Sequence, residues 1–266
     1  MRTIVLFLIL LGCGTSHITA QNDYLVTTIP NQEDPLSEEE QFIKENFPLQ
    51  LLCKWTSGMK FMFIPSGRDM FLPTLSVYET EKGADNSVLK HKILTFAGYE
   101  EKSQKLSNDM SYSTRLIFEC DGEKYYYEIK NTRPDEICEK NPRAYINGLV
   151  NLKDVDTAKD LLTGRKIYVQ SDMAQVDDAN SYSGYREVSI PVNTEATITA
   201  IGVGSQAYPV KIIFQDSQGH SYYLEVALSR TNSGMDVSDF QAEKKMRYFS
   251  NAISFSSKKS GNLETL

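Results

Sequence analysis

The sequence predicts a mainly β protein that contains two copies of one small β-barrel, each preceded by a short helix. The first observation behind this prediction is an octet that occurs twice, as GEKYYYEI at residues 122–129 and as GHSYYLEV at residues 219–226. The second is that apolar and polar residues alternate with a period of two around both octets, which is typical of half-buried antiparallel strands. The third is a helix signal ahead of each copy.

The octets belong to longer blocks that recur in the same order in the two halves of the chain. The pairs are GMKFMFI (58–64) with GRKIYVQ (164–170), ILTFAG (93–98) with TITAIG (197–202), and RLIFECDGEKYYYEI (115–129) with KIIFQDSQGHSYYLEV (211–226). Because several blocks seldom match in one order by chance, we interpret the chain as an internally duplicated unit.

Ahead of the first copy, Ser37 is followed three residues later by Glu40. This pattern predicts a helix that starts with a capping box. Pro48 is expected to end or kink that helix. Leu51 and Leu52 then begin a second short element.

Ahead of the second copy, Asp156 is the expected N-cap of another helix, and Leu161 and Leu162 form its packed end. Gly58 and Gly164 follow the two predicted helices. A sharp turn at these positions favours a residue that accepts positive φ. Each copy is therefore expected to start with a helix, a glycine turn and a strand.

Within each copy, the alternation predicts which side chains face the core. In the strand before the hairpin loop, Leu116 and Phe118 of the first copy correspond to Ile212 and Phe214 of the second. The loops CDGE and DSQG contain the Asp and Gly residues that tight hairpins favour. About five short strands per copy are enough to curl into a small barrel.

On the opposite face of the strand after each loop, the pattern places Tyr126 and Tyr223. An outward tyrosine can stack on a sugar ring or on a proline of a peptide, so these two residues are the candidate ligand-binding residues. The alternative is that each packs against its own helix or against the other barrel. Trp55, the only tryptophan, is expected to pack in the core or between domains rather than to bind a ligand.

The predicted organisation has six segments. These are a signal peptide (1–20), a flexible segment (21–36), the first helix and barrel (37–130), a connector (131–153), the second helix and barrel (154–230), and a C-terminal helix with a frayed tail (231–266). The connector is rich in Asn, Pro and charged residues. The C-terminal helix is expected to begin at Ser238, with Gln241 completing a capping box.

The first segment has the features of an export signal. Arg2 precedes an apolar run from Ile4 to Leu11, which is too short to span a membrane. Cleavage after Ala20 would leave Gln21 as the new N-terminus and a secreted or periplasmic protein. In the alternative, LLGC resembles a lipobox, and lipidation of Cys13 would give an outer-membrane lipoprotein. No second apolar segment follows, so no transmembrane segment is predicted.

The charge of the chain argues against one class of partner. The protein has 35 acidic and 28 basic residues, a formal net charge of −7, and loss of residues 1–20 removes one arginine and no acid. Proteins that bind nucleic acid depend on basic residues that neutralise phosphates, so nucleic acid is not expected. An envelope glycan or a protein partner remains, and the oligomeric state is left open.

Cleavage at Ala20 leaves three cysteines, Cys53, Cys120 and Cys138. In an oxidising compartment one pair can form, and Cys120 with Cys138 is predicted because they are nearest in sequence. The alternative is three buried thiols that behave as small apolar residues. The cysteines have no CxxC or His-rich spacing, so no metal site is predicted.

The sequence favours a protein without catalytic activity and without a cofactor. A hydrolase with a nucleophile needs a partnered histidine, and the mature chain has only His91 and His220, both expected to be exposed. No nucleotide or metal motif has its required context. Two alternatives to a binding protein are kept, a secreted hydrolase acting on polysaccharide or peptide and a lipid-anchored structural or assembly factor.

The order of strands and turns in residues 58–130 and 164–228 resembles SH3-like small barrels, including bacterial SH3-type modules of envelope proteins. The tandem arrangement is also similar to repeat proteins exported by Bacteroidetes, which have no assigned activity. The resemblance implies two SH3-like barrels that bind an envelope ligand, and it implies no site residues.

Overall fold

The computed structural model describes residues 36–48, 50–65, 72–106, 109–140, 146–181, 184–228 and 248–257. These described residues belong to one compact unit. The predicted signal peptide, Cys13, the segment before residue 36 and the C-terminal helix at Ser238 lie outside the described residues. In the described part of the chain, no helix is both long enough and apolar enough to cross a membrane.

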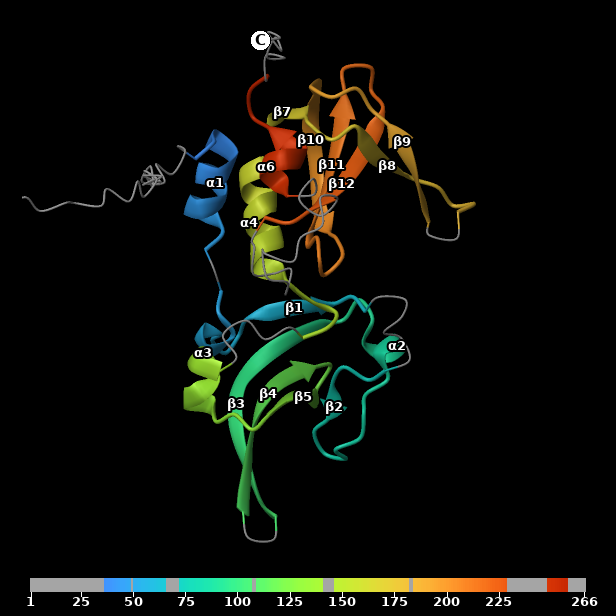
Figure 1. Cartoon of the computed structure of the whole chain (residues 1–266). Helices are drawn as coiled ribbons and strands as arrows, with labels where there is room; N and C mark the ends of the chain where they lie inside the picture. The colour runs from blue at the N-terminus through green and yellow to red at the C-terminus, as the bar shows by residue number, and fades with distance from the viewer. Residues whose placement is uncertain are drawn as a thin grey trace, which may run out of the picture. The chain divides into compact units, whose positions relative to one another are not determined.

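The protein is mainly β, as predicted, and its strands form two curled antiparallel sheets (Figure 1). The first sheet has the strand order β2-β5-β4-β3-β1-β6. Its strands are β1 (Lys60–Phe63), β2 (Ser76–Val77), β3 (Ile93–Leu106), β4 (Asp109–Cys120), β5 (Glu123–Lys130) and β6 (Leu149–Asn151). A short helix, α2 (Asn86–Leu89), lies between β2 and β3 in the sequence.

The second sheet has the strand order β13-β7-β10-β11-β12-β8-β9. Its strands are β7 (Lys166–Val169), β8 (Met173–Asp177), β9 (Tyr185–Ser189), β10 (Thr194–Val203), β11 (Val210–Asp216), β12 (Ser221–Val226) and β13 (Ile253–Ser254). A one-turn helix, α6 (Phe249–Ala252), directly precedes β13.

The two sheets share one strand order. In the first sheet β5, β4, β3 and β1 are consecutive, and in the second β12, β11, β10 and β7 follow each other in the same way. At one side of this group, β2 pairs with β5 in the first sheet and β8 pairs with β12 in the second. At the other side, β6 pairs with β1 and β13 pairs with β7. Among the described strands, no pairing joins the two ends of either sheet, so closure into an SH3-like barrel is not seen.

A β-bulge occurs at the same place in both copies. Phe96 pairs with Phe118 and Ile198 pairs with Phe214, and the register shifts immediately afterwards in each pair of strands. Phe96 therefore corresponds to Ile198. The sequence match of ILTFAG with TITAIG, which aligned Phe96 with Ala200, was wrong by two residues because strand pairing, not the shared glycine, defines equivalent positions.

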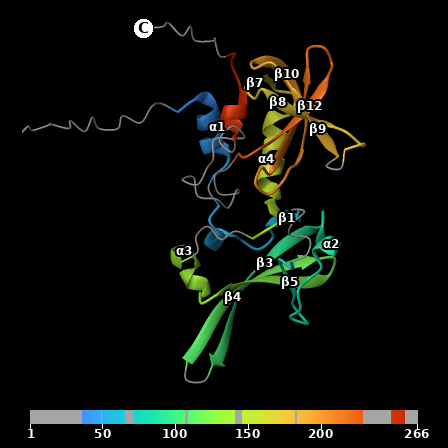
Figure 2. The same cartoon turned by 45° about the vertical axis from the view of Figure 1, so that its right-hand side comes forward.

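The long hairpin of the first sheet extends past its neighbour (Figures 1 and 2). Strands β3 and β4 stay paired as far as Leu106 and Asp109, whereas β5 leaves β4 at the pair of Ser113 with Lys130. From the pair of Ser103 with Tyr112 to the pair of Leu106 with Asp109, β3 and β4 therefore form a two-stranded ribbon.

The first helix is capped as predicted and the second begins earlier than expected. In α1 (Glu38–Asn46) the Ser37 hydroxyl accepts from the Glu40 amide, and the Glu40 carboxylate accepts from the Ser37 amide. A 3₁₀ turn, η1 (Leu52–Lys54), follows as the second short element. Helix α4 (Leu152–Leu162) has Asn151 as its N-cap.

The predicted cap of α4, Asp156, lies inside the helix, because Asn151 already accepts the amide of Lys153 one turn earlier. At the other end, Leu162 is fully buried as expected, but Leu161 is 42% exposed. Consecutive helical residues differ by about 100° in direction, so only one of the two leucines can face the core.

The described residues contain two hydrophobic cores. The first is rich in aromatic rings, with Phe61, Phe63, Phe96 and Phe118 fully or almost fully buried. The second is built mainly from branched aliphatic residues of β7, β10, β11 and β12 together with α4. These inward positions match the alternation predicted from the sequence.

The sequence suggested that helix α1 belongs to the first copy. In the structure, α1 packs on the second core instead. The ring of Phe42 lies 5.7 Å from Phe249 and 5.2 Å from Phe255, measured between centroids. The carboxylate of Glu39 accepts hydrogen bonds from the Ser254 hydroxyl (2.9 Å) and the Phe255 amide (2.8 Å). Position in the sequence therefore did not show which sheet this helix covers.

Within its described residues, the segment predicted to be a connector (131–153) contains helices and a strand. It forms a 3₁₀ turn (Pro134–Glu136), helix α3 (Ile137–Lys140), strand β6 and the start of α4. Strand β6 pairs with β1, so this segment supplies the last strand of the first sheet.

Candidate functional site

Tyr126, the first predicted ligand-binding residue, points to the outer face of the first sheet but is only 6% exposed. The guanidinium carbon of Arg115 lies 4.1 Å from the centre of its ring. Tyr78 meets the same ring edge to face at 6.3 Å. The aromatic face is therefore covered by a cation and cannot stack on a sugar.

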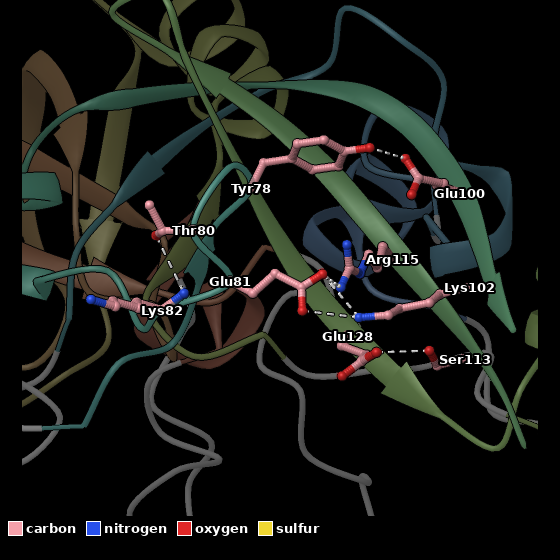
Figure 3. A network of polar contacts seen from close by, with 9 residues as sticks. All are labelled: Tyr78, Thr80, Glu81, Lys82, Glu100, Lys102, Ser113, Arg115 and Glu128. Carbon is pink, nitrogen blue, oxygen red and sulfur yellow. Dashed lines mark hydrogen bonds and ion pairs between the residues drawn. The ribbon is translucent and has the colours of Figure 1, made fainter. Parts of the chain in front are cut away.

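Arg115 is the centre of a polar network on this face (Figure 3). Its side chain is 6% exposed, and Nη2 donates to Glu81 Oε1 at 2.7 Å. The Nε atom is buried and has no hydrogen-bond partner. Because a buried cation without a counter-charge is costly, Glu81 supplies the negative charge that compensates Arg115.

Glu81 also binds a second cation. Lys102 Nζ lies 3.0 Å and 3.1 Å from its two carboxylate oxygens. Hydrogen bonds from Arg115 and then from Lys102 lower the pKa of Glu81. Glu81 belongs to the loop after β2, whereas Arg115 and Lys102 stand on β4 and β3.

Two other carboxylates on this face are held by hydroxyl groups. Tyr78 donates to Glu100 at 2.7 Å, and Ser113 donates to Glu128 at 2.7 Å. The hydrogen bond to Glu100 raises the pKa of Tyr78. We call the eight residues together the first outer-face cluster: Tyr78, Glu81, Glu100, Lys102, Ser113, Arg115, Tyr126 and Glu128.

The second sheet places a cation on Tyr223 in the same way. Lys211 Nζ lies 3.5 Å from the centre of the Tyr223 ring, which is 6% exposed. Lys211 also pairs with Asp177 of β8 at 3.6 Å. Burial, followed by the nearby charges of Asp177 and Glu225, raises the pKa of Tyr223 to about 12.

The pairing registers show that the two arrangements occupy equivalent positions. Tyr126 pairs with Ile117, and Tyr223 pairs with Ile213. Two residues further along each strand, and so on the same face of the sheet, Arg115 pairs with Glu128, and Lys211 pairs with Glu225. Each sheet therefore has a tyrosine, a cation over its ring and a glutamate opposite that cation.

The environment of the two tyrosines is neither an open ligand-binding surface nor a contact with a helix, the two arrangements that the sequence suggested. The tyrosines point outward as predicted, but neither is an open platform. Neither ring is covered by a helix in the contacts described; instead the cation of the neighbouring strand covers it. The sequence contained a signal for the two cations. The matching blocks RLIF and KIIF align Arg115 with Lys211, and the alternation places both on the same face of the sheet as Tyr126 and Tyr223.

The predicted disulfide between Cys120 and Cys138 was wrong. Cys138 of α3 pairs with Cys53 of η1, with a Cα–Cα distance of 5.2 Å. Cys120 is a free thiol, 6% exposed in the first core, and burial raises its pKa. Nearness in sequence was therefore misleading.

The remaining candidates have structural roles. His91 is exposed and lies in a left-handed turn (φ 63°) that precedes β3, and His220 Nδ1 lies 3.1 Å from Asp216 within the second hairpin loop. Trp55 packs in the first core as predicted, 4.5 Å from the ring of Phe61. Within the described residues, no group of three or more His, Cys, Asp or Glu side chains is arranged to hold a metal ion.

Comparison with known proteins gives no family for the chain. No protein-family model matches it, and neither a curated protein nor a solved structure matches it.

Proposed function

We propose that the protein is an exported, non-enzymatic binding protein that uses the outer faces of its two sheets to hold an envelope glycan or a protein partner. The observation that carries this proposal is the cation stacked on a tyrosine at equivalent positions of both sheets. The two copies keep this outward group although their cores differ, one aromatic and the other aliphatic.

The tyrosines serve in this proposal as positioning residues. A cation on an aromatic ring is attracted by the negative face of the π system and loses part of its freedom to move. Tyr126 and Tyr223 therefore hold Arg115 and Lys211 at fixed points on their sheets. A preorganised cation costs less entropy when a ligand binds to it.

Two further observations support the proposal. The Cys53–Cys138 disulfide suits an oxidising compartment outside the cytoplasm. Two equivalent faces in one chain suit a repetitive ligand, because the second contact becomes intramolecular once the first has formed.

The test is retention of the mature chain on cell-wall, mucin and capsular polysaccharides and on envelope protein extracts. We expect Tyr126→Leu and Tyr223→Leu each to weaken retention, and the double variant to weaken it by about tenfold or more because avidity is lost. Tyr168→Leu is the matched control, since Tyr168 is a partly buried tyrosine of β7, away from β12 in the strand order.

Equal retention of the double variant and the wild type would remove both faces from consideration. Absence of retention on every matrix would contradict the binding function itself. Circular dichroism of each variant would confirm that the sheets remain folded.

A further inference from the structure

We propose that the first outer-face cluster binds a saccharide that carries a carboxylate, such as a uronic acid, and that Glu81 occupies the place of this carboxylate in the free protein. This inference rests on the proposed function, because it names the ligand class of one of the two faces.

The cluster has the donors that a free carboxylate needs. Arg115 and Lys102 both point at the single carboxylate of Glu81 (Figure 3), the first at 2.7 Å and the second at 3.0 and 3.1 Å. Charge-assisted bonds of this kind are about twice as strong as neutral ones, and a guanidinium presents a planar set of donors suited to a carboxylate. A ligand carboxylate could therefore replace Glu81 without any change in the two cations.

Glu81 is attached in a way that allows this exchange. It stands in the loop after β2 with φ 55°, a left-handed conformation that is uncommon for a residue other than glycine, and its side chain is 54% exposed. The two cations are fixed to the sheet, and Arg115 is 6% exposed beneath the loop. The occupant is thus the accessible partner, and the cations stand on the strands of the sheet.

Arg115 has unused capacity for hydrogen bonding. Its Nε atom is buried and makes no hydrogen bond, although a buried polar group usually has a partner. Glu81 contacts Nη2 alone. The present occupant therefore satisfies the guanidinium incompletely.

The surroundings favour a sugar over an acidic peptide or a phosphate. Glu100 and Glu128 flank the cations, and each already accepts a hydrogen bond from a hydroxyl, of Tyr78 or Ser113. Sugar hydroxyls can donate to such carboxylates in the same way. A ligand with several negative charges would instead be repelled by them and by the net charge of −7. One carboxylate surrounded by hydroxyl groups is the chemistry that fits.

The experiment is calorimetric titration of the mature chain with a neutral oligosaccharide that ends in a single galacturonic acid, so that the ligand carries one carboxylate. We expect Glu81→Gln to bind about tenfold more tightly than the wild type, because it removes the carboxylate that competes with the ligand for Arg115 and Lys102. Lys102→Gln should bind about tenfold more weakly, and added salt should weaken binding to all variants.

The matched control is Glu119→Gln. Glu119 stands on β4, is 52% exposed and pairs loosely with Lys124 at 3.9 Å. Its variant has the same change in net charge as Glu81→Gln. We expect its affinity to stay within about twofold of the wild type, as for an exposed pair far from the ligand. Equal gains in Glu119→Gln and Glu81→Gln would show a general charge effect and overturn the proposal.

Two further probes identify the ligand class. The methyl ester of the same oligosaccharide should bind at least about tenfold more weakly than the acid, since it cannot form charge-assisted bonds. A hexaglutamate peptide should not compete. Equal binding of the ester, or preference for the peptide, would overturn the uronic-acid proposal, and so would failure of both oligosaccharides to bind. The retention experiment above would still decide separately whether the protein is a binder.

Discussion

At the scale of single residues, Tyr99 shows how one hydroxyl connects distant parts of the first copy. It stands on β3 and donates to the carbonyl oxygens of Leu52 and Trp55, in and beside η1. Burial raises the pKa of Tyr99 to about 12. The neutral phenol is therefore the form that the folded state holds.

The raised pKa of Tyr99 predicts a dependence of stability on pH. The folded state keeps the proton to about pH 12, whereas the unfolded chain loses it near about pH 10. The contribution of Tyr99 to stability is thus complete below about pH 10 and is lost as the pH rises towards about 12. Urea denaturation of the wild type and Tyr99→Phe should show a difference that shrinks over this range, and a constant difference would contradict it.

Two glycines test the duplication at equivalent residues. Gly58 (φ 91°) and Gly164 (φ 83°) donate to Phe96 and Ile198, the residues before the two bulges. An added Cβ meets nothing within 4 Å at either glycine. We expect Gly58→Ala and Gly164→Ala each to cost about 1–2 kcal/mol, from the left-handed backbone alone.

The control for this pair is Gly202→Ala, because Gly202 lies within β10 outside the left-handed region and its Cβ would make only an ordinary contact with Lys211 at 3.8 Å. It should leave the urea midpoint unchanged or raise it. A cost at only one of Gly58 and Gly164 would mean that the two turns are not equivalent.

At the scale of elements, the disulfide joins η1, which precedes the first sheet in sequence, to α3, which follows its hairpin strands. Cys53 and Cys138 are 85 residues apart. Closing a loop of this length reduces the entropy of the unfolded chain and is expected to contribute about 4–5 kcal/mol. The second sheet has no disulfide among its described residues, so the first copy depends more on oxidation.

Replacement of both cysteines by alanine should destabilise the protein by about 4–5 kcal/mol in denaturant titrations. Hydrogen exchange should rise first in β3, β4 and β5. Cys120→Ala is the control, since it removes the free thiol and leaves the Cys53–Cys138 peptide intact in an unreduced digest. A digest that links Cys120 to Cys138 would contradict the pairing.

At the scale of the whole molecule, α1 joins the beginning of the described chain to its end. Glu39 is 3% exposed and binds Ser254 and Phe255, more than 200 residues away in sequence. The hydrogen bonds to its carboxylate are charge-assisted, and they fix β13 beside β7 and α1. The last strand of the second sheet therefore depends on the first helix.

Glu39→Ala should cost about 2–3 kcal/mol, because two buried hydrogen bonds to a charged group are lost. It should also increase amide exchange at Phe255. Its neighbour Glu38, which pairs with Arg165 at 3.3 Å and is 60% exposed, supplies the control. Glu38→Ala should cost less than about 1 kcal/mol, as exposed ion pairs do, and equal effects of the two variants would refute the role of Glu39.

How far the sequence predicts the molecule depends on the range of the interaction. The capping box at Ser37, the hairpin turns and the inward alternation from Leu116 to Phe118 were correct because each is decided within a few residues. The outward direction of Tyr126 was also correct. The occupant of its aromatic face was missed, because the alternation gives the direction of a side chain and not its neighbours across the sheet.

The sequence by itself determined the mainly β class, the hairpins of β4 with β5 and of β11 with β12, and the two outward tyrosines, since alternation and turn residues act locally. Only the tertiary structure decided that α1 packs on the second core, that Cys53 rather than Cys120 pairs with Cys138, and that Glu81 meets Arg115. These contacts join residues that are far apart in sequence, and they depend on how the chain passes over its sheets.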